Sequence, residues 1–288
     1  MASDPQVILI TGCSTGLGRC IAEEALAKGL RVIATARRLS AIEDLRDKGA
    51  RIFTLDVNDK PTALKNFAAE AINAFGQVDI LVNNAGWLLG GAVEENTPEE
   101  VQSQFATNFF SVINVTDAFL PHFRSRRTGT IVNISSQGSY LAGTGAGIYC
   151  TTKAALDCLT EVWAKELEPF NIRAVSIILG AFRTSVASSN TKASTNIIEG
   201  YDAAHKFHED FRKRSGQEIG DPVKAAKRIL DLVTMKTEKP LPSRFAVGED
   251  AIQLSKKHLK QRLSELEEWS SFGQGTNVDG VVYEGADW

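Results

Sequence analysis

The sequence has few cysteines, no long apolar run and no excess of positive charge, and each shortage excludes a class of protein. Only four cysteines occur in 288 residues and none forms a C-x-x-C pair, which excludes a disulfide framework or a zinc-binding cysteine motif. No run approaches the ~20 apolar residues of a membrane-spanning helix. The formal net charge of −3 offers no basic bias for nucleic acid or anionic membranes. We therefore expect a soluble cytoplasmic protein with no metal, nucleic-acid or membrane partner.

The sequence does have a regular alternation of buried strands and amphipathic helices. Continuous, mostly β-branched runs predict seven strands, at residues 6–10, 31–36, 51–55, 78–82, 130–134, 172–178 and 243–247. Helical spacing predicts helices between them, at residues 16–28, 61–75, 98–123, 148–167 and from 222 onward. The alternation predicts an α/β fold with a Rossmann-type doubly wound parallel sheet of about seven strands. Helices should cover both faces, in a single domain of residues 1–288.

Two parts of the chain depart from this alternation. Residues 185–220 are polar and weakly patterned, with a helix expected at 196–214. Residues 249–269 predict a charged amphipathic helix, and a C-terminal tail extends from there to residue 288. The tail carries four side chains that we expect to dock on the body: Val281, Val282, Tyr283 and Trp288.

A glycine-rich turn follows the first predicted strand directly, and a predicted helix follows the turn. Glycine lets the backbone approach a pyrophosphate closely, and the free N–H groups of a helix N-terminus bind it. The spacing is Gly-x3-Gly-x-Gly, and many turns between strand and helix carry two glycines, so the turn alone is weak support for a dinucleotide site. The residues expected to contact the dinucleotide here are Gly12, Ser14, Thr15, Gly16, Leu17 and Gly18.

The residues after the second and third strands bear on which dinucleotide binds. Arg37 and Arg38 follow the second strand, where an acidic residue would bind the ribose hydroxyl of NAD and a basic one the 2′-phosphate of NADP. Because guanidinium pairs strongly with phosphate, Arg37 favours NADP(H), although surface arginines are common in such loops. Asp56 and Val57 follow the third strand. Asp56 is placed to accept a hydrogen bond from adenine, or alternatively to cap the next helix.

Tyr149 and Lys153 are four residues apart in a predicted helix, so they lie on one face of it. A free tyrosine titrates near pH ~10. A lysine ammonium a few ångströms away favours the phenolate, so we expect Lys153 to lower the pKa of Tyr149 and suit it to acid–base chemistry. The pair alone carries little weight, because a half-buried tyrosine beside a solvated lysine is the commoner arrangement.

Five motifs occur in one order along the chain: Thr11-Gly12-x3-Gly16-x-Gly18, Asn83-Asn84-Ala85-Gly86, Asn108, Ser136 and Tyr149-x3-Lys153. Together they resemble the short-chain dehydrogenase/reductase family, in its compact single-domain branch. The match covers most of residues 6–184 and continues more loosely to about 247. The resemblance implies oxidoreductase activity with a nicotinamide cofactor, and catalytic roles for Asn108, Ser136, Tyr149 and Lys153.

The resemblance also implies individual roles. Ser136, thirteen residues before Tyr149, would orient the substrate carbonyl; Ser135 is its competitor, since alternate residues of a strand face opposite sides. Asn108 would hold a water in a proton relay to Lys153, or else be a buried asparagine satisfied by neighbouring backbone. Further contacts to the cofactor would come from Asn83, Ala85, Gly86, Tyr149, Lys153, Gly180, Phe182 and Thr184.

By the same resemblance, residues 185–220 form a lid over the substrate. Residues of the lid and of nearby strand ends are expected to line an apolar pocket: Trp87, Leu88, Leu89, Phe182, Tyr201, Phe207 and Phe211. The alternative is that they pack the lid onto the body. Leu179 stands where the family usually has proline, which removes a fixed φ ahead of Gly180 and leaves the path of that turn open.

The expected activity is NADPH-dependent reduction of a medium-sized lipophilic or aromatic ketone. Tyr149 would donate a proton to the developing alkoxide, Ser136 would bind the same oxygen, and Lys153 would bind the nicotinamide ribose. Two alternatives stay open: an NAD-linked dehydrogenase working in the oxidative direction, and a cofactor-binding protein without turnover. The resemblance implies a homodimer or homotetramer that associates through the helices at 98–123 and 148–168.

Overall fold

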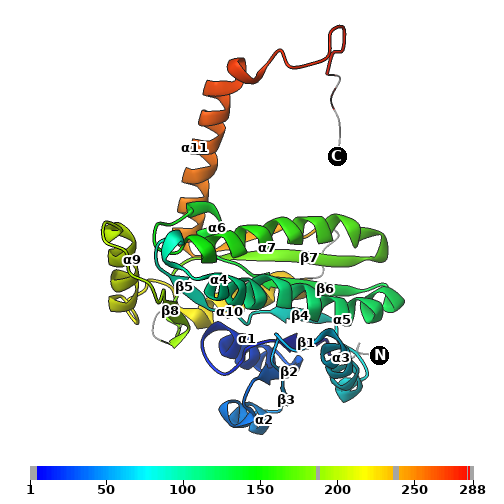
Figure 1. The fold of residues 1–288 in the computed structure, drawn as a ribbon. Coiled ribbons are helices and arrows are strands. Elements are labelled where there is room, and N and C mark those ends of the chain that lie inside the picture. Colours follow the sequence, from blue (N-terminus) through cyan, green and yellow to red (C-terminus); the bar gives the residue numbers. More distant parts are fainter. Residues whose placement is uncertain (1–4, 186–188, 236–239, 284, 286–288) are drawn as a thin grey trace.

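The computed structural model describes residues 5–185, 189–235, 240–283 and 285 (Figure 1). Its centre is a parallel sheet of seven strands in the order β3-β2-β1-β4-β6-β7-β9. The strands are β1 (Val7–Ile10), β2 (Arg31–Ala36), β3 (Arg51–Thr54), β4 (Ile80–Asn83), β6 (Gly129–Ile134), β7 (Ile172–Leu179) and β9 (Arg244–Val247). The prediction of a doubly wound parallel sheet of about seven strands is confirmed.

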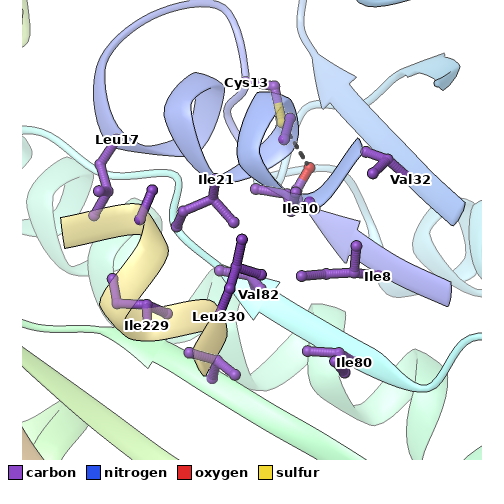
Figure 2. Close-up of a cluster of buried hydrophobic side chains, with 14 of the residues drawn as sticks. Ile8, Ile10, Cys13, Leu17, Ile21, Val32, Ile80, Val82, Ile229 and Leu230 are labelled. Atoms are coloured by element: carbon purple, nitrogen blue, oxygen red, sulfur yellow. Dashed lines mark hydrogen bonds between the residues drawn. The ribbon is translucent and has the colours of Figure 1, made fainter. Parts of the chain in front are cut away.

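Helices cover both faces of the sheet. One face is covered by α1 (Gly16–Ala27), α2 (Glu43–Asp47) and α10 (Pro222–Thr234), and the other by α3 (Pro61–Phe75), α5 (Ser111–Arg126) and α7 (Gly147–Glu166). Successive residues of a strand point to opposite sides. In β1, Ile8 and Ile10 therefore lie in the apolar cluster under α1 and α10 (Figure 2), whereas Val7 and Leu9 lie in the cluster under α3, α5 and α7.

Side chains at the first turn explain where two of the helices begin. Asp221 caps α10, because its carboxylate accepts hydrogen bonds from backbone N–H groups of the first turn. Thr97 caps α4 (Pro98–Phe105) through its hydroxyl, while the Glu100 carboxylate binds back to the Thr97 N–H at 2.9 Å. Such caps satisfy N–H groups that have no partner within the helix.

The long helix predicted over 98–123 is interrupted near its middle. Between α4 and α5, the segment Ala106–Phe110 forms a π-helical turn, which holds one more residue than an α-helical turn. Asn108 lies at the centre of this segment and is 1% exposed. The prediction of an uninterrupted α-helix is therefore wrong in this detail, at a residue singled out for function.

Sequence patterns miss three short elements near the carboxyl ends of the strands. One is α6 (Gly138–Leu141), in the glycine-rich stretch after β6. The others are β5 (Leu88–Gly90) and β8 (Thr191–Ala193), which pair in parallel as a separate two-stranded sheet. Three or four residues are too few to show a hydrophobic period. The lid helix α9 (Asp202–Lys213) is also shorter than the helix expected at 196–214.

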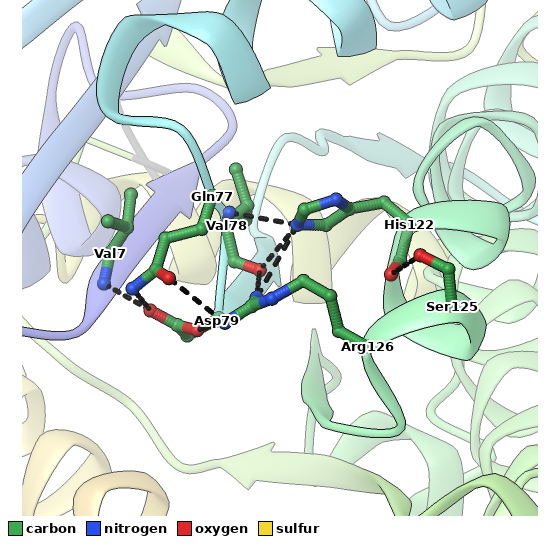
Figure 3. Close-up of polar contacts among 7 residues, drawn as sticks. All are labelled: Val7, Gln77, Val78, Asp79, His122, Ser125 and Arg126. Atoms are coloured by element: carbon green, nitrogen blue, oxygen red, sulfur yellow. Dashed lines mark hydrogen bonds and ion pairs between the residues drawn. The ribbon is translucent and has the colours of Figure 1, made fainter.

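A cluster of hydrogen-bonded polar side chains lies at the amino edge of the sheet, where β1 and β4 begin (Figure 3). The Asp79 carboxylate accepts hydrogen bonds from the Val7 N–H at 2.8 Å and from the Gln77 side-chain amide at 3.0 Å. The guanidinium of Arg126, at the end of α5, donates to Asp79 at 2.8 Å and to Gln77 at 3.1 Å. These four residues, the amino-edge clamp, tie two strands to one helix.

The last helix, α11 (Glu249–Gly273), leaves the body of the protein (Figure 1). Its first turns contact β9 and α6. In the tail beyond it, Val281, Val282 and Tyr283 are exposed, so the expectation that they dock on the body is wrong. Trp288 lies outside the described residues. Within the described ranges, no helix is long and apolar enough to cross a membrane.

Candidate active site

The glycine turn lies where the strand order of the sheet reverses. The chain runs from β1 to β2 and β3 on one side of β1, and then returns to β4 on its other side. Open α/β sheets bind ligands at such a switch point, outside the carboxyl ends of the strands. Because the strands are parallel, the glycine turn, the segment Asn83 to Gly86 and Ser136 all meet at this carboxyl edge. Ser14 lies half-buried within the turn.

Close backbone packing in the glycine turn depends on two of its glycines. Gly12 has a φ of +73°, a conformation that L side chains rarely adopt. A Cβ on Gly18 would lie 2.3 Å from Nδ2 of Asn84. That nitrogen donates hydrogen bonds to the carbonyls of Thr11 at 2.8 Å and Gly12 at 3.1 Å. Asn84 belongs to the Asn83-Asn84-Ala85-Gly86 motif but was not among the residues expected to contact the cofactor; it fixes the glycine turn against the end of β4.

The N-terminus of α1 is left open at this edge. Its N-cap residue, Thr15, makes no side-chain hydrogen bond to the helix backbone, and the Thr15 hydroxyl accepts a hydrogen bond from the Ser185 hydroxyl at 2.7 Å. The first N–H groups of the helix belong to Gly16, Leu17 and Gly18, and such groups carry partial positive charge. Leu17 buries its side chain in the core. The backbone N–H groups at this helix N-terminus suit a diphosphate group.

The side chain of Asn83 does not reach the carboxyl edge. Asn83 is 4% exposed, and its amide donates to Thr116 at 3.0 Å and to Asn133 at 2.9 Å. These partners lie on α5 and β6, so the side chain is turned into the layer between the sheet and its helices. The expectation that Asn83 binds a cofactor can then apply only to its backbone. Ala85 and Gly86, which follow Asn84, are half-buried at the edge.

The residues after β2 and β3 differ in what they already bind. Arg37 and Arg38 are exposed, and neither guanidinium bonds to another residue within the described ranges. Asp56 accepts a hydrogen bond from the Asn58 N–H at 3.0 Å and so forms a local turn, which is not the helix cap considered as its alternative role. Val57 is buried. Arg37 and Arg38 are thus available to a phosphate.

Ser136 and Tyr149 share a small space after β6. Gly138 lies between them: a Cβ on it would be 3.4 Å from Oγ of Ser136 and 3.5 Å from Cε1 of Tyr149. Ser136 also accepts a hydrogen bond from the Gly138 N–H at 3.1 Å. Ser135, in contrast, is 2% exposed and donates to the carbonyl of Lys153 at 3.4 Å. The structure places Ser136 beside Tyr149, and its catalytic role stays a prediction.

Lys153 is almost fully buried, one helical turn beyond Tyr149. Its Nζ donates to the carbonyl of Ile134 at 2.7 Å and lies 5.7 Å from the centroid of the Tyr149 ring. Burial lowers the pKa of Lys153 to about 8, although the negative charge of Asp157 acts to raise it. Burial also raises the pKa of Tyr149 to about 12, partly opposed by a hydrogen bond with Ser136. The expectation that Lys153 brings the pKa of Tyr149 below its free value is wrong here, because burial is the largest influence on this phenol and raises its pKa.

Two side-chain amides hold the segment that follows Gly86. Asn108 accepts a hydrogen bond from the Trp87 N–H at 3.1 Å and donates to the Trp87 carbonyl at 2.9 Å. Gln104, one turn earlier, donates to the same carbonyl at 2.9 Å. A Cβ on Gly86 would lie 3.2 Å from Oδ1 of Asn108 and 3.8 Å from Nζ of Lys153, so these two polar atoms face one small space. Asn108 is satisfied by backbone, and its relay role stays a prediction.

Gln104 was missed in the sequence, although a signal was available. It stands four residues before Asn108 in a predicted helix and is 0% exposed. Residues four apart share a helix face, so a glutamine on the face of Asn108 was a candidate for the same backbone segment.

Asp250, at the start of α11, contacts the turn that follows β7. The Asp250 carboxylate accepts a hydrogen bond from the Ala181 N–H at 2.7 Å. It also fills the place of a side chain on Gly180, where a Cβ would lie 2.0 Å from Oδ1. Thr184 reaches the glycine turn, since a Cβ on Gly16 would be 3.4 Å from the Cβ of Thr184. Nothing in the sequence marks the role of Asp250.

The segment expected to form a lid packs on the body in its described residues, 189–220. Its strand β8 pairs with β5, and Nζ of Lys192 lies 4.9 Å from the centroid of the Trp87 ring. The buried carboxylate of Glu95 accepts a hydrogen bond from the Ile198 N–H at 2.8 Å and pairs with Nε2 of His205 at 2.5 Å. Glu95 and His205 were also missed, because residues 110 positions apart show no pairing in a single sequence.

A cavity of about 570 Å³ lies between the lid and the loop that leads into α7. Glycines and alanines line most of it, and Gly147 brings its wall to within two residues of Tyr149. The ionisable side chains in the lining are Glu94 and Tyr201, whose hydroxyl donates to the Glu94 carboxylate at 2.6 Å. Among the described residues, none of those lining the cavity carries a positive charge. The cavity therefore has one negative group, the Glu94 carboxylate, at its wall.

The expected aromatic lining of this cavity is mostly wrong. Of the residues named for it, Tyr201 lines the cavity. The others pack within the protein: Leu88 and Leu89 in β5, Trp87 under Lys192, Phe182 against Gly220, and Phe207 on Phe211. Packing of the lid onto the body, the alternative, describes these side chains better.

Comparisons with known proteins point to one family. The family described as short chain dehydrogenase matches residues 6–195. Oxidoreductase BOA17 of Botryotinia fuckeliana (strain B05.10) is 34% identical over 269 residues, 92% of this chain and 96% of that protein. The 3-ketodihydrosphingosine reductase of Bacteroides thetaiotaomicron is 34% identical over 246 residues, 85% of this chain and 88% of that protein.

Solved structures agree with these matches. A short-chain dehydrogenase from Streptomyces avermitilis is 38% identical with a TM-score of 0.87, covering 96% of this chain and 100% of that chain. More distant structures of the same fold are described as complexes with NADP+ or with NAD, so the fold does not choose between the two dinucleotides.

Proposed function

The chain belongs to the short-chain dehydrogenase family, and from this premise we propose that it is an NADPH-dependent ketone reductase. Family membership supports an oxidoreductase that uses a nicotinamide cofactor. The observation that carries the proposal is the meeting of Ser136, Tyr149 and Lys153 at the carboxyl edge of the sheet. The direction of the reaction, the choice of NADPH and the substrate class rest on the residues around them.

The residues at this edge fit a nicotinamide dinucleotide. The open N-terminus of α1 and the backbone at Gly12 and Gly18 suit its pyrophosphate. Ala85 and Gly86 would lie against a ribose, and Thr184 is near enough to the glycine turn to bind the nicotinamide half. When bound, the nicotinamide supplies a hydride to the carbonyl carbon.

Tyr149 would act as the acid. With a pKa raised to about 12 it is a phenol at neutral pH, the form that donates a proton to a carbonyl oxygen gaining negative charge. Ser136, beside the ring, would hydrogen-bond the same oxygen and stabilise its charge. The Lys153 ammonium, 5.7 Å from the ring centroid, would stabilise the phenolate left behind. A phenol that holds its proton favours reduction over oxidation near pH 7.

Arg37 supports NADPH as the cofactor. It follows β2, the strand next to β1, where the ribose of the adenosine half lies in dinucleotide folds. Its guanidinium is exposed and makes no bond to another described residue, so it can pair with a 2′-phosphate. The segment Ala36 to Arg38 also lacks the acidic side chain that a 2′-hydroxyl would need.

The cavity supports a medium-sized ketone without negative charge. Its volume of about 570 Å³ is in the range of small-molecule sites. Glu94 in its wall would repel an anionic substrate and accept a hydrogen bond from a hydroxyl or ammonium group. The name of the Bacteroides relative describes the reduction of a ketone, which supports the same direction here.

Fluorescence titration of the purified protein with NADPH and NADH tests the choice of cofactor. We expect NADPH to bind about tenfold more tightly or better, and Arg37→Ala to weaken NADPH binding about thirtyfold with no change for NADH. Arg46→Ala, another exposed arginine, is the matched control. Equal or tighter binding of NADH would favour the NAD-linked alternative, and binding of neither would reject the dinucleotide site.

A further inference from the structure

The helix α11 carries a surface that is not covered in the part of the chain that the structure describes. It spans 25 residues, about 37 Å at 1.5 Å per residue, and Figure 1 shows it projecting from the body. Its outer part holds Leu259, Leu263, Leu266 and Trp269, which are 52%, 55%, 68% and 64% exposed. In proteins, the stability of a helix comes mostly from packing of an apolar face, and the outer part of α11 has no such packing.

These four side chains form one stripe along the helix, the α11 stripe. They recur at spacings of four, three and three residues, which keeps them on one side. Monomeric soluble proteins rarely expose a contiguous apolar patch of this kind, and such a patch marks an interface. The stripe is separate from the helices at 98–123 and 148–168, through which the family resemblance implied association.

The charges of α11 are segregated along its length. Beyond Glu249 and Asp250 of the first turn, basic residues come first, namely Lys256, Lys257, Lys260 and Arg262, and acidic residues follow, namely Glu265, Glu267 and Glu268. None of them makes an ion pair with another residue of the described ranges. At about 100° per residue, Lys260 and Glu267 lie on one side of the three leucines, and Arg262 and Glu265 lie on the other side, near Trp269.

We propose that the α11 stripe binds the same stripe of a second copy of this chain, with the two helices antiparallel. A two-fold axis between residues 263 and 264 sets Lys260 opposite Glu267 of the partner subunit. The same axis sets Arg262 opposite Glu265 of the partner subunit, on the other flank. Two-fold symmetry repeats both ion pairs, and the leucines of the two stripes are buried between them.

Two other arrangements fit these charges less well. A parallel pair would set Lys260 beside Lys260 of the partner subunit and Glu267 beside Glu267 of the partner subunit, so like charges would repel. An anionic membrane would attract the basic half of the helix and repel its acidic half. In the antiparallel pair, one register sets the basic residues of each helix opposite the acidic residues of the other.

The molar mass of the full-length protein in solution, measured by light scattering over a dilution series, tests the proposal. We expect Leu263→Asp to halve the mass of the wild-type assembly, because it buries a carboxylate next to its own symmetry mate. Ser264→Asp, which points away from the stripe, is the matched control and should leave the mass unchanged. A wild-type mass of one chain, or a mass that Leu263→Asp does not change, would overturn the proposal.

Charge exchange tests the direction of the helices and leaves the apolar stripe intact. Lys260→Glu and Glu267→Lys should each weaken self-association about tenfold, since each sets like charges opposite one another. The double variant should restore wild-type association, and Glu268→Lys, on the far face, should have no effect. A double variant no better than the single ones would overturn the antiparallel register. Binding of a monomeric wild-type protein to phosphatidylserine vesicles would overturn self-association as the role of the stripe.

Discussion

The two edges of the central sheet are both polar, but their polar groups have different partners. At the amino edge, Asp79 and Arg126 bind each other and the neighbouring residues, so each charge is satisfied within the protein. At the carboxyl edge, the N-terminus of α1 is uncapped and the guanidinium of Arg37 has no partner among the described residues. Polar groups that the fold satisfies hold structure, whereas those it leaves open are available to a ligand.

This difference separates stability from activity. Substitutions at the amino edge should change the free energy of unfolding and leave the chemistry alone. Substitutions at the carboxyl edge should change the rate of the reaction and leave the free energy of unfolding unchanged. The following variants test that division.

The largest effect is expected at the carboxyl edge, at Tyr149. Tyr149→Phe removes the proton donor and keeps the ring, so kcat for ketone reduction should fall about 10³-fold. The unfolding temperature and the Kd for NADPH should change little, because the buried ring is kept and fills the same space. Tyr283→Phe, in the exposed tail, is the control. A kcat above about a tenth of wild type would contradict the role of Tyr149 as acid.

The raised pKa of Tyr149 predicts different pH profiles for the two directions of the reaction. Reduction needs the phenol, which dominates at every pH well below about 12, so its rate should be flat between pH 6 and 8. Oxidation of the product alcohol needs the phenolate, whose fraction rises about tenfold per pH unit, so its rate should rise about 100-fold over that range. Lys153, with a pKa of about 8, is almost fully protonated at pH 6 and half protonated at pH 8. An oxidation rate that does not change with pH would contradict this assignment.

The amino edge should respond in stability alone. Asp79→Ala removes the centre of the amino-edge clamp and leaves Arg126 unpaired, so the free energy of unfolding should fall by about 2 kcal/mol. Urea unfolding measures this change, with the exposed Asp47→Ala as its control. The ratio kcat/KM of the folded variant should match wild type. A loss of kcat/KM without a loss of stability would break the division between the two edges.

The smallest effect concerns the cavity that we propose to bind the substrate. We expect wild type to reduce 4-(hydroxymethyl)acetophenone with a kcat/KM about tenfold above that for 4-acetylphenylacetate, whose carboxylate meets the charge of Glu94. Glu94→Gln should remove most of this preference, and Glu99→Gln, outside the cavity, should keep it. A preference that survives Glu94→Gln would show that another group selects the substrate.

The central part of the fold is readable in the sequence because parallel strands buried on both faces appear as continuous apolar runs. The same is true of Tyr149 and Lys153, whose spacing needs only a helix to bring them together. What the sequence could not show depends on contacts between distant segments. β5 and β8 are three residues each and pair across about a hundred positions, and Glu95 meets His205 across a similar gap.

Burial also determines side-chain directions and pKa values that local sequence patterns do not show. Adjacent asparagines gave no sign that Asn83 faces inward and Asn84 holds the glycine turn, because that depends on which side of β4 each residue points to. The pKa of Tyr149 moved opposite to the expected direction, because a neighbouring lysine is visible in sequence and the loss of solvent is not. The apolar positions of α11 were visible, but their exposure was not.

The most direct test of the account follows the hydride itself. The purified protein would be incubated with 4-(hydroxymethyl)acetophenone and NADPH carrying deuterium at both C4 positions, and the alcohol product analysed by mass spectrometry. The account predicts one deuterium on the new carbinol carbon with wild type, and almost no product with Tyr149→Phe over the same time. An alcohol without deuterium, or no alcohol from a wild-type protein that binds NADPH, would contradict it.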